Sequence, residues 1–453
     1  MLHMLWANCS IRERAHLAAR GASGKLAAWR GGSIPLACSP PEGIGSLSKF
    51  QGIRYNAKLK RRKGAGPVTL RMENPAVRRL LQRAEAVLPE VIEELITICE
   101  IPAPTFQEER RTQYVQQRMT ELGLHGVTVD AVGNVVGRIP GTGGGPTLLL
   151  AAHIDTVFPM ETEIRVRRDG EILRAPSVGD NSASVASMLW VARLLLEEKV
   201  SLAGDVIFAA TVGEEGLGNL RGIRSVMERY GDEVDYVLAL DGSLGSMVRQ
   251  GVGSRRFRLV VQGEGGHSWG AFGTPSAIHS LCRMVTRISE LRVPANPKTT
   301  YNVGNISGGT SVNTIAARAE AILDLRSLDR AELKRLESRV RRIVAEVARE
   351  TGVSADLELL GDRPIGSIPE DHPLCVLVRT VHREMGIQTR SYPSSTDANI
   401  PLSMGIPAVT VGVTLGGNGH RLDEYIHTSP LPRGIGQILL LLLAAQSLPL
   451  RAR

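Results

Sequence analysis

Five short polar clusters contain the kinds of side chain that bind metal ions and move protons. Each follows or lies close to an apolar segment, and together they are His153-Ile154-Asp155, Gly179-Asp180-Asn181, Gly213-Glu214-Glu215-Gly216, Leu240-Asp241-Gly242 and Gly419-His420-Arg421-Leu422-Asp423-Glu424. Imidazole nitrogens and carboxylate oxygens form a mixed N/O ligand set, which suits Zn²⁺ or a related divalent ion. Because no cysteine thiolate belongs to the set, we expect a catalytic metal site.

Each cluster also has a simpler interpretation when it is taken alone. The segment 153–155 could be a turn with an Asp cap, Glu214 and Glu215 a solvated pair, Asp180 a helix cap, and Asp241 part of a turn. Their joint order at the ends of apolar strands favours one shared site. Charges buried there would be costly unless a metal or a counter-charge compensated them.

The apolar pattern predicts the sheet that must position these side chains. Continuous apolar runs predict buried strands over residues 147–152, 205–211, 234–240 and 408–413. Helical patterns cover residues 77–100, 110–122, 183–198 and 431–445, and paired short strands are expected within 127–138. We therefore expect an α/β fold with a mixed, mainly parallel sheet flanked by helices and a site at the carboxyl edge.

The pattern changes after Gly251. Residues 256–262 and 317–325 alternate as half-buried strands, whereas 275–291 and 330–351 are helical. The buried-strand pattern returns after Pro364. We predict a small α+β domain over 251–363, inserted between two parts of a catalytic domain at 72–250 and 364–448.

The amino-terminal 71 residues differ from the rest in charge. The chain has 453 residues and a formal charge of +8, but residues 1–71 carry 13 Lys/Arg against two acids, so the remainder is slightly negative. This leader could be a disordered basic tail, a transit peptide or translation from an upstream start, and we favour the last. Without a basic body or interleaved aromatics, nucleic-acid binding is not expected.

Cysteine content and hydropathy indicate the compartment. Five scattered cysteines support neither a disulfide framework nor a thiolate site, which fits a reducing cytoplasm. The longest apolar run, residues 438–445, is far shorter than the roughly 18 residues that a membrane span requires. We expect a soluble cytoplasmic protein that does not bind membranes.

As an ordered set, the clusters resemble the zinc-dependent exopeptidases and deacylases. This family includes peptidase T, carboxypeptidase G, succinyl-diaminopimelate desuccinylase, acetylornithine deacetylase and aminoacylase, and the resemblance covers residues 84–443. It implies two divalent metal ions, zinc with cobalt or manganese as alternatives, bound to a zinc exopeptidase-like catalytic domain. It also implies that the inserted domain is a ferredoxin-like lid that makes a homodimer. The motifs are most similar to peptidase T-like members.

The resemblance assigns metal ligands residue by residue. Asp180 would bridge two ions, with His153 and Asp241 on one ion and Glu215 and His420 on the other.

It also assigns a proton carrier and a supporting carboxylate. Glu214 would be the general base, and Asp155 would hydrogen-bond the far nitrogen of His153 to fix its tautomer. His427 is the alternative to His420, which we prefer for its spacing from Glu424. Ser184 departs from the family, which usually has glycine there, and could crowd the turn.

Further residues would bind the substrate. In the family, the histidine matching His267 stabilises the oxyanion, commonly from a partner subunit. Asn313 and Arg326 match lid segments that hold the substrate, although Arg326 could instead pair with Asp324 or Asp329. Thr396 and Asp397 match a loop of the substrate pocket, and the alternative is a helix N-cap.

The expected function is hydrolysis of an amide bond. We favour a metallo-exopeptidase that acts on short peptides. A deacylase of N-acyl amino acids is the alternative, since it uses the same metal chemistry. A non-catalytic binding module on the same fold is the remote alternative, and it predicts that a ligand or the base is missing, whereas none is.

Overall fold

The computed structural model describes residues 72–452, so the interpretations of the leader at 1–71 lie outside the described residues. Two separate hydrophobic cores form within this range, each beside its own main sheet. Among the described cysteines, Cys99 and Cys375 are buried and Cys282 is exposed, and all three are free thiols. No helix in this range is both long and apolar enough to span a bilayer.

The larger core surrounds a six-stranded mixed sheet. Its strands, in spatial order, are β1 (His125–Val129), β2 (Val135–Ile139), β6 (Val206–Thr211), β3 (Leu148–His153), β7 (Tyr236–Leu244) and β18 (Ala408–Gly412). The pairs β6–β3, β3–β7 and β7–β18 are parallel, whereas β1–β2 and β2–β6 are antiparallel. Every residue of β3 and β6 is buried, as expected for strands covered on both faces. The predicted mixed, mainly parallel sheet is confirmed.

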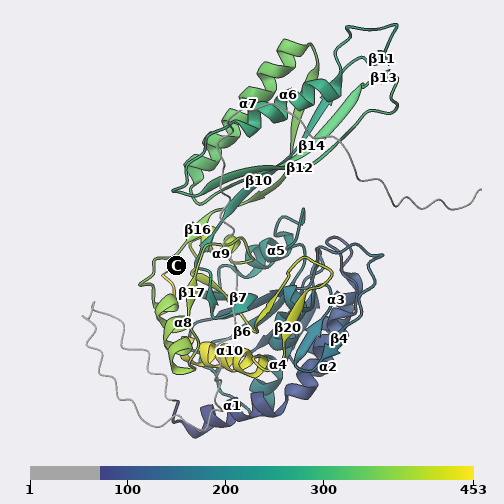
Figure 1. The fold of residues 1–453 in the computed structure, drawn as a ribbon. Coiled ribbons are helices and arrows are strands. Elements are labelled where there is room, and N and C mark those ends of the chain that lie inside the picture. The colour runs from purple at the N-terminus through teal and green to yellow at the C-terminus, as the bar shows by residue number, and fades with distance from the viewer. Residues whose placement is uncertain (1–71, 453) are drawn as a thin grey trace, which may run out of the picture. The chain divides into compact units, whose positions relative to one another are not determined.

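Helices pack around this sheet (Figure 1). They are α1 (Pro75–Ala86), α2 (Leu88–Cys99), α3 (Glu109–Glu121), α4 (Ser184–Glu197), α5 (Arg221–Tyr230), α8 (Pro373–Glu384), α9 (Asn399–Ser403) and α10 (Leu431–Ala445). The helix α4 packs on β3, β6 and β7, and α10 packs on α4 and α8. The single helix predicted over 77–100 was wrong. The chain breaks at Val87 because Pro89 lies in the first turn of α2, where its ring cannot continue a preceding helix.

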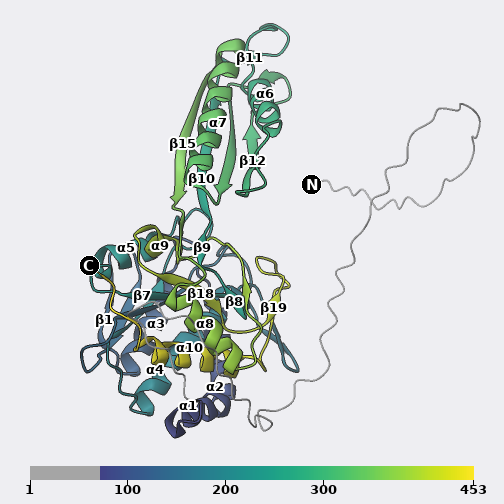
Figure 2. The ribbon, with the colours of Figure 1, turned by 90° about the vertical axis from the view of Figure 1, so that its left-hand side faces the viewer.

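The smaller core lies against a four-stranded antiparallel sheet. Its strands, in spatial order, are β12 (Thr299–Gly308), β14 (Arg318–Ser327), β10 (Gly253–Gln262) and β15 (Ser354–Arg363). With α6 (Ala277–Ser289) and α7 (Arg330–Thr351), the chain order is β-α-β-β-α-β, the ferredoxin-like order. Figure 2 shows α7 lying along β10 and β15. The predicted bounds of α7 are confirmed, since Asp329 caps its first turn and Gly352 ends it with a φ of 73°.

Short strands complete the described chain. A small sheet contains β19 (Gly416–Gly417), β20 (Tyr425–His427), β5 (Ile172–Arg174) and β4 (Arg167–Asp169), and two-residue pairs join β11 (Gly266–His267) to β13 (Thr314–Ile315), β16 (Gly366–Ser367) to β9 (Gln250–Gly251) and β17 (Arg390–Ser391) to β8 (Ser246–Met247). The adjacent parallel strands β6, β3 and β7 matter most for chemistry, because side chains at their carboxyl ends meet at one edge of the sheet.

Candidate metal centre

Four side chains of the candidate site lie on, or shortly after, three neighbouring strands. His153 is the last residue of β3, Glu214 and Glu215 follow the end of β6, and Asp241 lies in the second half of β7. Asp180 comes from the irregular turn Val178–Ala183 before α4. These are the positions that the strand pattern predicted.

The ligand atoms of five side chains converge into two groups that share Asp180. His153, Asp180 and Asp241 form one group, and Asp180, Glu215 and His420 form the other, with ligand atoms in each group within 4.8 Å of one another. The two oxygens of Asp180 face different histidines, because Oδ1 lies 3.1 Å from His153 Nε2 and Oδ2 lies 3.1 Å from His420 Nε2. A carboxylate in this position can bridge two cations.

The chemistry of His153 tests whether a cation fits. Its Nδ1 lies 3.1 Å from the main-chain oxygen of Asp155, which can only accept, so Nδ1 carries the hydrogen of the neutral ring. The opposite nitrogen, Nε2, is buried, has no hydrogen-bond partner among the described residues, and points its lone pair at a carboxylate oxygen of Asp180. A proton or a cation must lie between two such electron donors, so the donor set fits a metal ion.

The electrostatics of the cluster lead to the same conclusion. Hydrogen bonds that the protonated ring donates to Asp180 and Glu215 raise the pKa of His420 to about 11. Burial, together with the nearby Asp180 carboxylate, raises the pKa of Asp241 to about 7. Each group therefore favours a protonated state because the carboxylates crowd one another. Divalent cations would stabilise all of these carboxylates in their ionised form.

Asp155 supports the turn that carries Glu214 and Glu215. Its two carboxylate oxygens accept hydrogen bonds from the main-chain N–H groups of Glu214 and Glu215, each at 2.9 Å, and from the Thr105 hydroxyl at 2.8 Å. We expected this carboxylate to hold the far nitrogen of His153. That nitrogen lies 3.6 Å from the Asp155 carboxylate, too far for a hydrogen bond, and contacts the Asp155 main chain instead.

Glu424 is a second supporting carboxylate, for which the sequence predicted no role. Glu424 accepts hydrogen bonds from the main-chain N–H groups of Ser177 at 3.1 Å, Gly179 at 2.7 Å and Asp180 at 2.8 Å. It is buried, and burial raises the pKa of its carboxyl to about 7. Glu424 thereby fixes the main chain of the turn that presents Asp180. Its position four residues after His420 was the only signal in the sequence.

Glu214 is buried beside the metal-binding groups. One of its carboxylate oxygens lies within 4.8 Å of ligand atoms of His153 and Glu215. Its carboxylate also forms an ion pair with Arg363, which is the last residue of β15 and was not predicted. Burial raises the pKa of Glu214 well above its usual range, although the Arg363 charge opposes this.

Several predicted residues lie apart from this cluster. His427 belongs to β20, where it pairs with Ile172 and its ring packs edge-on against Tyr425, and it joins neither ligand group. His267 and Asn313 are exposed and contact residues of their own unit, and Arg326 donates to Asp324 at 2.6 Å. Within residues 72–452, these last three side chains form no hydrogen bond or ion pair with the metal ligands.

The predicted pocket residues Thr396 and Asp397 are buried. The Thr396 hydroxyl lies 2.7 Å from that of Thr410, and Asp397 accepts a hydrogen bond from Thr211 at 2.5 Å. Ser184, where we expected crowding, has ordinary helical angles with φ −71° and ψ −39°. The turn therefore accommodates its side chain.

Comparisons with known proteins agree with this geometry. The family model for peptidase family M20/M25/M40 matches residues 149–444. The uncharacterized protein YqjE of Bacillus subtilis is 24% identical over 342 residues, covering 71% of this chain and 90% of that protein. Succinyl-diaminopimelate desuccinylase of Paraburkholderia xenovorans is 25% identical over 357 residues, covering 72% and 92%.

A solved structure supports the fold. The crystal structure of aminopeptidase PepT from Bacillus cereus matches with a TM-score of 0.65 and 22% identity, covering 79% of this chain and 98% of that one. The family model matches well over half of the chain, and all five ligand residues lie inside the matched range. The chain therefore belongs to the peptidase family M20/M25/M40.

Proposed function

We propose that this protein is a two-metal hydrolase that cleaves an amide bond in short peptides, acting as an exopeptidase. The observation that carries the proposal is the pair of ligand groups that share Asp180 beside the buried carboxylate of Glu214. Similarity to an aminopeptidase structure supports the fold that such a peptidase needs.

His153 and Asp241 would hold one ion, Glu215 and His420 the other, and Asp180 would bridge them. Imidazole and carboxylate ligands without thiolates suit zinc, with cobalt or manganese as alternatives. When bound, such a pair of ions supplies a water of lowered pKa and polarises the scissile carbonyl.

Glu214 would carry the proton. It lies beside the ligand groups, and its carboxylate is free of the Asp180-centred groups, so it can accept the proton of the attacking water. It would then donate that proton to the nitrogen of the departing amine. Asp155 holds the main chain of Glu214, and Glu424 holds the main chain of Asp180. These contacts would keep both carboxylates directed at the same reaction site.

We propose that the segment built on the smaller sheet is an inserted lid. Its side chains would complete the site. Main-chain N–H groups of Trp269 and Gly270 lie 3.2 Å and 3.3 Å from His267 Nδ1. These contacts favour the tautomer in which Nε2 carries the hydrogen, the form that can donate to an oxyanion. Asn313 and Arg326 would hold the substrate, and Thr396 and Asp397 would shape its pocket from inside. The lid would also make the homodimer interface of a cytoplasmic enzyme.

A deacylase of N-acyl amino acids is the second candidate. The 25% identity to a succinyl-diaminopimelate desuccinylase over most of both chains favours it. The bond broken is again an amide, so the same ligands and the same proton carrier would serve. Only the fit of the acyl or peptidyl group separates the two functions.

One experiment tests both candidates. The purified protein is loaded with Zn²⁺, Co²⁺ or Mn²⁺ and assayed against di- and tripeptides and N-acetyl and N-succinyl amino acids, in parallel with Glu214→Gln. We expect cleavage of at least one class and a loss of about 10²- to 10⁴-fold in kcat for Glu214→Gln with its metal content unchanged. If neither class is cleaved, or if Glu214→Gln is as active as the wild type, the proposal fails.

A further inference from the structure

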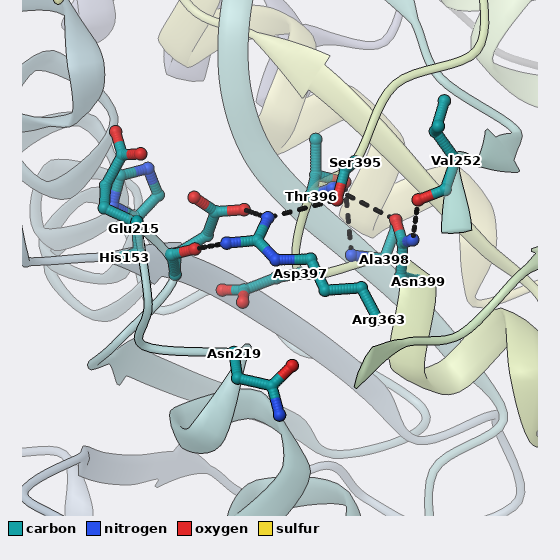
Figure 3. Close-up of polar contacts among 12 residues, drawn as sticks. His153, Glu215, Asn219, Val252, Arg363, Ser395, Thr396, Asp397, Ala398 and Asn399 are labelled. Atoms are coloured by element: carbon teal, nitrogen blue, oxygen red, sulfur yellow. Dashed lines mark hydrogen bonds and ion pairs between the residues drawn. The ribbon is translucent and has the colours of Figure 1, made fainter. Parts of the chain in front are cut away.

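A buried arginine contacts the proposed proton carrier. Arg363 is the last residue of β15, at the point where the chain leaves the smaller sheet, and it is only 5% exposed. Its Nη1 donates to Glu214 Oε1 at 3.1 Å and to the Ser395 hydroxyl at 3.0 Å, and its Nη2 donates to the Glu214 main-chain oxygen. Figure 3 shows the guanidinium directed at Ser395 and lying close to Asp397.

These contacts hold Glu214 at two points. One arm of the planar guanidinium binds the carboxylate and the other binds the main chain of the same residue, which restricts both the side-chain rotamer and the peptide plane. A lysine could not reproduce this geometry, because its single ammonium lacks the fixed fork. Two buried charges of opposite sign also need each other, since either alone would be costly to bury.

The backbone around Arg363 is itself fixed. Asn219 Oδ1 accepts the main-chain N–H of Asp362 at 2.9 Å, and Arg224 donates to the Asp362 main-chain oxygen. The Asn399 amide donates to the Val252 oxygen at 2.9 Å (Figure 3). It also donates to the Pro364 oxygen at 2.9 Å, so one side chain holds the two chain segments that flank the smaller sheet. Arg363 therefore projects from an anchored position.

We propose that Arg363 is a positioning residue that orients Glu214 for proton transfer, so that the end of β15 contributes to catalysis without touching the substrate. The proposal rests on the proposed role of Glu214 as proton carrier. No covalent step involves Arg363, which acts only through the orientation of Glu214. Displacing a proton carrier by about an ångström can cost roughly 10²-fold in rate.

The test compares Arg363→Met with Arg258→Met in the full-length, metal-loaded protein. Arg258 is a matched control, because it pairs at 2.9 Å with Glu358 of β15, the strand that also carries Arg363, and takes no part in the contacts that hold Arg363 or Glu214. We expect Arg363→Met to lower kcat by on the order of 10²-fold while KM and metal content stay near wild type, and Arg258→Met to keep wild-type kcat. Free guanidinium ion should restore part of the kcat of Arg363→Met.

Two further variants keep the test decisive if Arg363→Met does not fold. Arg363→Lys keeps the charge without the fork, and we expect an intermediate kcat. In the Glu214→Gln background, removing Arg363 should cause no additional loss, because the two residues act as one unit.

Equal kcat values for the Arg363 and Arg258 variants would overturn the inference and leave the proposed function standing. So would a rise in KM alone, which would make Arg363 a substrate-binding residue, or additive losses in the double variant. A wild-type protein that cleaves no amide would overturn both.

Discussion

Replacing Asp155 by asparagine should damage the site and the fold together. In the structure, both oxygens of this fully buried carboxylate accept main-chain N–H groups, one from Glu214 and one from Glu215. Asparagine has a single oxygen, so its NH₂ group would face one of these N–H donors at 2.9 Å. The turn that presents Glu214 and Glu215 would have to move.

The expected magnitude follows from these contacts. A hydrogen bond to a charged group contributes about 1.5–3 kcal/mol, and Asp155→Asn loses one such bond and weakens another. We therefore expect a loss of about 3 kcal/mol in the free energy of unfolding. Supporting residues of this kind typically change metal affinity or activity by about 10- to 100-fold, so we expect kcat/KM to fall within that range.

Asp130→Asn provides the matched control. Asp130 Oδ1 accepts main-chain N–H groups of Val132 at 3.0 Å, Gly133 at 3.0 Å and Asn134 at 2.9 Å, but this loop carries no proposed ligand. Urea unfolding, metal titration and peptide hydrolysis would be measured for both variants. We expect both to lose stability and only Asp155→Asn to lose metal affinity or activity. If Asp155→Asn kept wild-type metal affinity and kcat/KM, the proposed role of its carboxylate would be refuted.

Three other predictions concern the ligands, the metal ions and pH. His420→Ala should lose one of two bound ions and its hydrolytic activity, whereas His427→Ala should keep both ions. Atomic emission measures the bound metal of each variant, and the opposite pattern would exchange the roles of the two histidines. Removing divalent ions with a chelator should lower Tm in calorimetry, because Asp180, Glu215 and Asp241 then repel one another. A ligand present at 100 times its Kd stabilises the folded protein by about 2.7 kcal/mol, and the chelator removes this contribution of the metal. An unchanged Tm would contradict this. Burial lowers the pKa of His382, whose ring hydrogen-bonds Thr389 and Gln437, so the unfolded state binds its proton more readily and stability should fall as pH drops below about 6.5. Urea midpoints of wild type and His382→Gln should converge over that window, and parallel curves would argue against it.

Buried strands and the long amphipathic helix α7 were the features that the sequence predicted best. Long apolar runs are unambiguous when both faces of a strand are buried, and β3 and β6 therefore lie within one residue of their predicted ranges. The helix α7 is bounded by Asp329 and Gly352, whose side-chain cap and positive φ are local properties. By contrast, the polar and glycine-containing edge strand β12 was not predicted, because its pairing with β14 depends on tertiary contact.

The metal ligands could be predicted for the same reason, since they follow predicted strands or occur in short motifs. Asp155 was also predicted as a supporting carboxylate, but Arg363 and the role of Glu424 were not. Arg363 lies 149 positions from Glu214 in the chain, and an arginine at the end of an amphipathic strand gives no local sign of its partner. The hydrogen bonds of Glu424 likewise depend on a turn almost 250 residues earlier.

The central claim is that two cations share Asp180 beside Glu214. Crystals of the zinc-loaded protein, measured on both sides of the zinc absorption edge, would test it most directly. Two anomalous peaks that each contact one oxygen of Asp180, one near His153 and Asp241 and the other near Glu215 and His420, are the predicted result. A single peak away from Asp180, or none among these five side chains, would contradict the account.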